Sequence, residues 1–181
     1  MSNCQNAFDF ERLIVNIPDY PTPGVIFKDI TPLIADPQGF AAVVDGIAEH
    51  FMGRGVTKVV GAEARGFLVG APVALRLGAG FVPARKPGKL PREVLSESYD
   101  LEYGSASLEI SADALGPDDV VLIVDDLVAT GGTAVAQAKL VERFGAKLAG
   151  MGFLMELAFL NPRPAIAEAT DAEVFSLVQV E

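Results

Sequence analysis

The segment VVLIVDDLVATGGT, residues 120–133, places the strongest constraint on what this chain can fold into. It begins with five apolar residues, mostly β-branched, a composition typical of a central strand that is covered on both faces. Two adjacent carboxylates, Asp125 and Asp126, follow directly, and a loop rich in Gly and Thr comes next. Side-chain oxygens beside a loop with free N–H groups indicate a ligand that carries both hydroxyls and a phosphate.

Patterns typical of strands and of helices alternate on both sides of that segment. Short apolar runs indicate buried strands, and apolar residues at helical spacing indicate the helices between them. The expected strands are residues 56–61, 81–84, 120–124, 148–155 and 174–178, and the expected helices are residues 37–51, 66–77 and 133–144. Residues 99–110 are expected to form two short strands around Gly104. The alternation predicts an α/β fold with a mainly parallel sheet flanked by helices.

The length of 181 residues favours a single domain, residues 1–181, with a sizeable core. Asp36 followed by Pro37 marks a helix start, because the aspartate can cap the helix and proline suits its first position. About the first 35 residues and the last 25 fit the alternation poorly. We therefore expect a separate small lobe of approximately residues 1–35, to which the C-terminal residues could contribute.

Composition excludes several classes of function. A net charge of -10 argues against broad nucleic-acid binding, although the basic run RKPGKLPR, residues 85–92, could make a pocket locally positive. On charge alone, that run is more simply a solvated loop. No apolar run approaches the roughly 20 residues of a membrane-spanning helix, and no secretory signal begins the chain. The single cysteine, Cys4, cannot form an internal disulfide. We expect a cytoplasmic location, with no membrane and no nucleic-acid partner.

The loop after the two aspartates does not match the common nucleotide-binding motifs. A Walker loop requires Gly-Lys followed by Ser or Thr, whereas here Gly132 precedes Thr133 and Ala134. No GxGxxG fingerprint follows a predicted strand. The simplest structural alternative is a tight strand-to-helix turn with solvated acids. Two adjacent carboxylates at a buried strand end are costly without a partner, however, so a binding role is favoured.

Several segments resemble known proteins. Residues 120–132 resemble the phosphoribosyl pyrophosphate signature of the type I phosphoribosyltransferases. The segments that resemble the adenine phosphoribosyltransferases within that superfamily are residues 18–37, 63–70, 85–91 and 98–110. The resemblance implies the fold of that superfamily, with an N-terminal hood at approximately residues 1–35. It also implies transfer of the phosphoribosyl group to adenine, which gives AMP and pyrophosphate in purine salvage.

The resemblance also implies roles for the residues that bind phosphoribosyl pyrophosphate. Asp125 and Asp126 would hold the ribose hydroxyls, directly or through water bound to Mg²⁺, the implied cofactor. Arg65 would meet the pyrophosphate, and Lys86 and Lys89 lie on a loop that closes over the site in this family. The residues that would cradle the 5-phosphate are Ala129, Thr130, Gly131, Gly132 and Thr133.

The adenine pocket implied by the resemblance lies in the N-terminal lobe. Phe27 would stack on the purine, backbone groups near Val25 and Lys28 would read its edge, and Leu127 would pack on the other side. On composition alone, Phe27 is more simply a core residue. Lys28 lies where many relatives carry Arg. The positive charge is kept, but the planar guanidinium group, which can donate two parallel hydrogen bonds, is absent.

Position 129 bears on the choice of base. The hypoxanthine-guanine enzymes carry an aspartate there, whereas Ala129 cannot transfer a proton. The resemblance implies Glu102 as the acid/base residue, with Tyr103 beside it at the site. Without the resemblance, Glu102 would be interpreted as a solvent-exposed acidic residue of a strand. Two alternatives stay open: a transferase for xanthine or another purine, and a regulatory protein that senses phosphoribosyl pyrophosphate. A homodimer is expected from the family.

Overall fold

The computed structural model describes residues 8–100 and 105–181 of the chain. The chain divides into two compact units, residues 1–43 and residues 44–181. The helix α2, Pro37–Phe51, contains the boundary between the units. Asp36 begins α2 as the sequence predicts, because its Oδ1 accepts a hydrogen bond of 2.7 Å from the Gly39 N–H.

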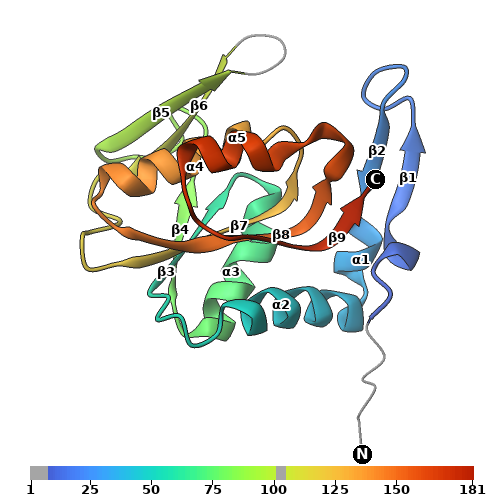
Figure 1. The fold of residues 1–181 in the computed structure, drawn as a ribbon, viewed down its shortest axis with the longest axis horizontal. Coiled ribbons are helices and arrows are strands. Elements are labelled where there is room, and N and C mark those ends of the chain that lie inside the picture. The colour runs from blue at the N-terminus through green and yellow to red at the C-terminus, as the bar shows by residue number, and fades with distance from the viewer. Residues whose placement is uncertain (1–7, 101–104) are drawn as a thin grey trace, which may run out of the picture. The chain divides into compact units, whose positions relative to one another are not determined.

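The first unit is built around a β-hairpin. Strands β1, Val15–Pro18, and β2, Ile26–Asp29, pair antiparallel with Val15 opposite Asp29, and the hairpin is drawn in blue in Figure 1. A 3-10 helix, Glu11–Leu13, precedes the hairpin, and the short helix α1, Thr31–Ala35, follows it. Leu33 of α1 is fully buried. The strands carry partly exposed apolar side chains, so this unit has a much smaller core than the second one.

The second unit contains a parallel sheet of five strands in the order β4-β3-β7-β8-β9. The strands are β3, Lys58–Ala62; β4, Gly80–Ala84; β7, Val120–Val128; β8, Lys147–Leu157; and β9, Val174–Val180. From β3 the chain moves outward to β4, whereas from β7 it moves in the opposite direction to β8 and β9. The boundary between β3 and β7 is therefore the switch point of the sheet, where ligands of such folds usually bind.

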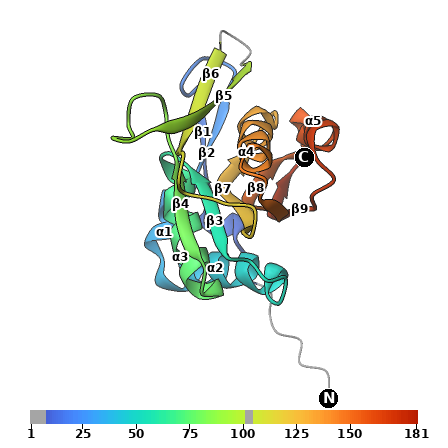
Figure 2. The same ribbon diagram turned by 90° about the vertical axis from the view of Figure 1, so that its left-hand side faces the viewer.

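Helices cover both faces of this sheet. Right-handed crossovers that leave the switch point in opposite directions place α3, Arg65–Leu77, and α4, Gly132–Arg143, on opposite faces. Figure 2 shows this arrangement, with α5, Pro162–Ala169, on the same side as α4. A second 3-10 helix, Ala158–Leu160, precedes α5. The large side chains buried in this unit are Ile47, Phe51, Ile110, Leu122, Ile123, Leu140, Met151, Phe153, Leu154, Met155 and Ile166.

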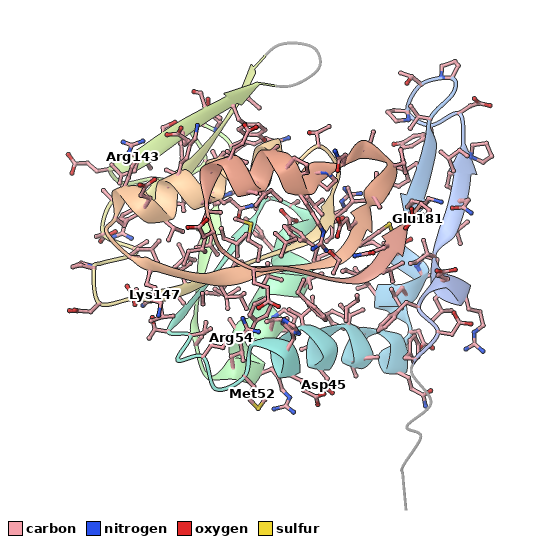
Figure 3. The ribbon with its side chains drawn as sticks, viewed as in Figure 1. Asp45, Met52, Arg54, Arg143, Lys147 and Glu181 are labelled. Carbon is pink, nitrogen blue, oxygen red and sulfur yellow. The ribbon has the colours of Figure 1, made fainter. Side chains whose placement is uncertain are left out.

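A second hairpin, β5, Val94–Asp100, and β6, Ser105–Ser111, lies beside α4. Arg143, at the last turn of α4, donates a 2.6 Å hydrogen bond from Nη1 to the Ser96 carbonyl of β5. Figure 3 shows the Arg143 side chain at the hairpin end of the helix. The sequence predicts two strands here, and the structure starts the first of them earlier, at Val94.

The structure confirms the α/β fold with a parallel sheet flanked by helices. Within this sheet, the main difference from the sequence-based expectations concerns β7. β7 continues through the aspartates to Val128 because β8 pairs with it as far as Glu156. The strand expected at residues 174–178 is confirmed as β9, the parallel edge strand of the main sheet. None of the helices within residues 8–100 and 105–181 has the length and apolar character needed to span a membrane.

Candidate active site

A cavity of about 540 Å³ opens at the carboxyl ends of β3 and β7, within the second unit. It lies at the switch point, where the turn after β3 and the loop after β7 diverge to opposite faces of the sheet. Most of its lining comes from those two segments and from the β5–β6 hairpin. The lining residues with polar or charged side chains are Glu63, Arg65, Lys86, Tyr99, Ser107, Asp125, Asp126, Thr130 and Thr133.

Asp125 and Asp126 lie inside the last part of β7 and are 8% and 5% exposed. On one side, β8 pairs with β7 through this region, and Asp125 lies opposite Phe153. On the other side, pairing with β3 ends at Val60 and Ile123, so the turn into α3 takes the place of a strand. Gly66 allows the start of α3 to lie this close to Asp125, because a Cβ on Gly66 would lie only 2.6 Å from Asp125 Oδ1.

The charges of the two aspartates are partly balanced by Arg65. Its Nε lies 2.8 Å from Asp126 Oδ2, and the Asp126 N–H donates a 2.9 Å hydrogen bond to Asp125 Oδ1. Burial, together with the neighbouring charge of Asp126, raises the pKa of Asp125 well above its usual value, while Arg65 acts in the opposite direction. Hydroxyl donors or a cation at this position would therefore stabilise the ionised carboxylate.

The loop of residues 129–133 lines the same cavity and leads into α4. Gly131 caps the helix with φ of 91°, a left-handed conformation that favours glycine. The first N–H groups of α4 have no partner within the helix and point out of its N-terminus, where the positive end of the helix dipole also lies. The first turn of α4 carries no acidic residue. Thr133 Oγ1 donates a 3.3 Å hydrogen bond to the Tyr99 hydroxyl of β5. The loop can therefore hold an anion.

The basic run of residues 85–92 contributes Lys86 to the cavity lining, but Lys89 is not among the lining residues. Glu63, which the sequence analysis did not single out, also lines the cavity. Its Oε2 accepts hydrogen bonds from Arg85 Nε at 2.9 Å and from the Lys86 N–H at 3.2 Å. The sequence places Glu63 and Arg85 22 residues apart, so only the pairing of β3 with β4 brings them together.

The residues expected at the adenine pocket fall in both units. Leu127 lines the cavity in the second unit, whereas Val25, Phe27 and Lys28 belong to the first. There the half-buried Phe27 ring makes an edge contact with Tyr20, with 5.3 Å between the ring centroids. Lys28 Nζ donates a 2.7 Å hydrogen bond to Asn16 Oδ1.

Two further residues expected at the site are outside the part of the chain that the structure describes. Glu102, the expected acid/base residue, and Tyr103 both lie in residues 101–104. The neighbouring Tyr99, at the described end of β5, does line the cavity. Tyr99 belongs to residues 98–110, one of the segments that carry the family resemblance, but no local pattern in the sequence indicates its role at the site.

Comparisons with known proteins agree with this fold. The chain matches the model of the phosphoribosyl transferase domain over residues 33–180, so its class is that of the phosphoribosyltransferases. An adenine phosphoribosyltransferase from Streptomyces coelicolor is 59% identical over 160 residues, which cover 86% of this chain and 88% of that protein.

Solved structures narrow the class further. The crystal structure of the adenine phosphoribosyltransferase from Thermoanaerobacter pseudethanolicus has a TM-score of 0.90 and 48% identity, and the match covers 94% of this chain and 98% of that one. The enzyme from Saccharomyces cerevisiae, solved with an imino-altritol bisphosphate and adenine, has a TM-score of 0.85 and 40% identity over 93% and 96%. The chain belongs to the adenine phosphoribosyltransferase family.

Proposed function

We propose that this protein transfers the phosphoribosyl group of 5-phosphoribosyl 1-pyrophosphate to adenine, giving AMP and pyrophosphate. The observation that carries the proposal is one cavity with a buried aspartate pair on one side and a helix-capping Gly-Thr loop on the other. A ribose phosphate carries hydroxyls that carboxylates can bind and a phosphate that the N–H groups of the loop can bind. The relative from Saccharomyces cerevisiae was solved with adenine and a sugar-like bisphosphate, which supports the same pair of substrates here.

Each side of the cavity would act on a different part of the sugar phosphate. Asp125 and Asp126 would accept hydrogen bonds from the ribose hydroxyls, and the N–H groups of residues 129–133 would hold the 5-phosphate. Arg65, Lys86 and Lys89 would stabilise the charge of the departing pyrophosphate. When the bond between ribose C1 and the pyrophosphate oxygen breaks, the electron pair leaves with pyrophosphate and positive charge develops on the ribose.

We propose that a magnesium ion binds in the cavity together with the substrate. Within residues 8–100 and 105–181, no three or more His, Cys, Asp or Glu side chains are grouped closely enough to hold a metal. The Asp125–Asp126 pair could still hold magnesium through water, with substrate oxygens as the other ligands, as this ion often binds. Bound there, magnesium would neutralise part of the pyrophosphate charge.

On the base side, adenine N9 would attack ribose C1 and lose a proton. We propose Val25, Phe27, Lys28 and Leu127 as the adenine-binding residues and Glu102 as the group that takes the N9 proton. Ala129 has no group that could do so. Closure of the loop that carries Lys86 and Lys89 would exclude water from the reacting carbon.

The test is an assay with phosphoribosyl pyrophosphate, Mg²⁺ and each purine base in turn. We expect AMP from adenine and no nucleotide from guanine, hypoxanthine or xanthine. Turnover of xanthine or another purine in place of adenine would assign a different base. Binding of phosphoribosyl pyrophosphate without turnover of any base would indicate a sensor of this compound.

A Glu102→Ala variant tests the proton-handling role. We expect kcat to fall about 100-fold or more while the affinity for phosphoribosyl pyrophosphate changes little, because the proton transfer occurs only in the chemical step. Steady-state kinetics and equilibrium binding of phosphoribosyl pyrophosphate measure the two quantities separately. Glu93→Ala, a carboxylate in the same stretch of chain that does not line the cavity, serves as the control. Unchanged kcat in Glu102→Ala would remove Glu102 from the mechanism.

We further propose that the protein acts as a cytoplasmic homodimer. The support for a dimer is the outer face of α3, where Leu68 is 50% exposed and Leu75 is 83% exposed. Seven residues apart, they lie on one side of the helix, a position that a second copy could cover. Light scattering should give twice the chain mass for the wild type and a shift toward monomer for Leu75→Glu. A monomeric wild type would contradict the proposal.

A further inference from the structure

The helix α5 is short and buries few of its side chains. It lies in the segment NPRPAIAEA, and only Pro162 and Ile166 of its eight residues are buried. Eight residues that include two prolines would not form a stable helix alone. Burying one Ile side chain contributes about 1.5–3 kcal/mol, which is small beside the cost of ordering the segment. Further contacts must therefore hold α5 in place.

Both buried residues of α5 lie against the loop that leads into α4. A Cβ on Gly131 would lie 3.0 Å from the Pro162 carbonyl oxygen and 3.4 Å from Ile166 Cγ1. A Cβ at Gly131 would therefore fit against the first turn of α5 only if α5 or the loop moved by a few tenths of an ångström. The position of α5 therefore limits the position of the loop at Gly131.

A buried carboxylate fixes the start of α5. Glu156, near the end of β8, is 2% exposed and lies opposite Val128 of β7. Arg163 binds both of its oxygens: Nε lies 2.8 Å from Oε1, and Nη2 lies 2.8 Å from Oε2. This two-point geometry fixes the orientation as well as the distance of the pair.

Two further bonds tie the same pair to β9. Ser176 Oγ donates a 2.8 Å hydrogen bond to Glu156 Oε2, and Arg163 Nη1 donates a 3.3 Å bond to the Val174 carbonyl. These contacts therefore connect Glu156 to Arg163, and the neighbouring Pro162 to Gly131, without a gap. They begin in the sheet and end at the loop of residues 129–133.

We propose that Glu156 and Arg163 are positioning residues that hold α5 against the loop of residues 129–133 and so fix its N–H groups for the sugar 5-phosphate. The inference rests on the proposed function for the identity of the anion. Neither residue lines the cavity, so both act through α5 and Gly131. Removing Arg163 would leave Glu156 buried without its charge partner and release the first turn of α5.

The test compares Arg163→Met and Arg163→Lys with a matched control, Arg54→Met. Arg54 Nη1 forms an ion pair of 2.5 Å with Glu173 Oε2, and neither residue lines the cavity. Three quantities are measured on each folded variant: hydrogen exchange of the amides of residues 129–135 without ligand, KM values in both directions of the reaction, and Tm.

We expect exchange of the loop amides to become about tenfold faster in Arg163→Met and to stay unchanged in Arg54→Met. KM should rise about 10- to 100-fold for phosphoribosyl pyrophosphate and AMP, which carry the 5-phosphate, and less than about twofold for adenine and pyrophosphate. Arg163→Lys should lie between Arg163→Met and wild type, because lysine keeps the charge but not the two-point geometry.

The outcomes separate the inference from the proposed function. Unchanged exchange in the loop of folded Arg163→Met would overturn the inference, as would equal rises in KM for substrates with and without the 5-phosphate. If Arg163→Met does not fold, the same criteria apply to Arg163→Lys. A wild-type protein that does not convert phosphoribosyl pyrophosphate and adenine to AMP would overturn the proposed function, while the exchange result would still decide whether α5 orders the loop.

Discussion

Gly66 shows how the lack of one side chain shapes the candidate active site. It lies in the first turn of α3, next to Arg65, and its Cα faces the carboxylate of Asp125. Any Cβ there would lie 2.6 Å from Asp125 Oδ1, a separation that side chains do not tolerate. The aspartate is itself almost fully buried, so it has little room to move away. Glycine at this position therefore lets α3 and β7 carry their charged groups into one cavity.

We expect Gly66→Ala to displace the Asp125 carboxylate and to reduce kcat/KM for phosphoribosyl pyrophosphate by about 100-fold. The expected loss of stability is about 1–3 kcal/mol, the usual cost of overpacking. Gly116→Ala is the matched control, because a Cβ at Gly116 would meet no heavy atom within 4 Å. Enzyme kinetics and thermal unfolding of both variants check the prediction, and equal activity of the two would contradict it.

Asp125 is kept at a cost to stability. Burial and the charge of Asp126 raise the pKa of Asp125, so the folded environment favours the protonated form over the carboxylate. A carboxyl group whose folded pKa is raised makes the native state less stable as pH rises from the unfolded pKa to the folded pKa. Such a cost is commonly retained where the charge serves binding or catalysis.

Asp125→Asn should accordingly raise Tm at neutral pH by about 2–4 °C while it lowers activity at least tenfold. Asparagine keeps an oxygen that can accept the Asp126 N–H but carries no charge. As the control, Asp45→Asn weakens an exposed 2.8 Å ion pair with Arg76 and should lower stability slightly or leave it unchanged. Differential scanning calorimetry near pH 7 measures both effects. A Tm below that of the wild type for Asp125→Asn would show that the ionised carboxylate stabilises the fold.

At the scale of elements, Glu63 joins two segments that the sequence analysis treated separately. It follows the end of β3, and it binds Arg85 and the Lys86 N–H just beyond the end of β4. Arg85 also donates a 3.2 Å hydrogen bond from Nη1 to the Lys89 carbonyl, so the bond to Glu63 anchors the base of the basic loop. The backbone of Lys86 is thereby held at the edge of the cavity that this residue lines.

We expect Glu63→Ala to lower kcat about tenfold without raising KM for phosphoribosyl pyrophosphate. Lys86 would no longer be fixed where the charge of the leaving group develops, while the freed Arg85 would add positive charge that keeps the substrate bound. Glu97→Ala serves as the control, because Glu97 pairs with Lys139 and Arg143 and does not line the cavity. A rise in KM with kcat unchanged would assign Glu63 to binding instead.

At the scale of the whole chain, acidic residues exceed basic ones, and several glutamates depend on a cationic partner. Hydrogen bonds from Arg163 lower the pKa of the buried Glu156. Burial raises the pKa of Glu63, but its bonds to Arg85 and the Lys86 N–H outweigh this and lower it. Hydrogen bonds from Arg54 and His50 lower the pKa of Glu173, whose side chain is 46% exposed and therefore well screened.

A folded pKa below the unfolded value means that the glutamate stabilises the protein fully above its unfolded pKa. The stabilisation is lost as pH falls through the lowered folded pKa. We expect Tm to fall by roughly 5 °C or more between pH 5 and pH 3, with Glu156 as the largest single contributor because it is the most buried. Glu156→Gln should have a lower Tm near pH 7 and a smaller fall in acid. A fall as steep as that of the wild type would exclude Glu156 as a major contributor.

The elements themselves follow from local patterns, which is why most of them are predictable. The apolar run at residues 120–124 favours a covered strand, and Asp36-Pro37 favours a helix start, as found at α2. The end of β7 is not predictable in this way. Nothing in the sequence near Asp125 indicates that the strand continues to Val128, because the continuation depends on the length of its partner β8.

The sequence by itself determined the kinds of group in the candidate site: a carboxylate pair, a Gly-Thr loop that starts a helix, and a basic run. These depend on residues close together in the chain, where spacing alone fixes which groups are neighbours. Only the tertiary structure decided that Gly66 admits Asp125, that Glu63 binds Arg85, and that α5 contacts Gly131. Each of these pairs depends on the order of strands in the sheet, which brings together residues far apart in the chain.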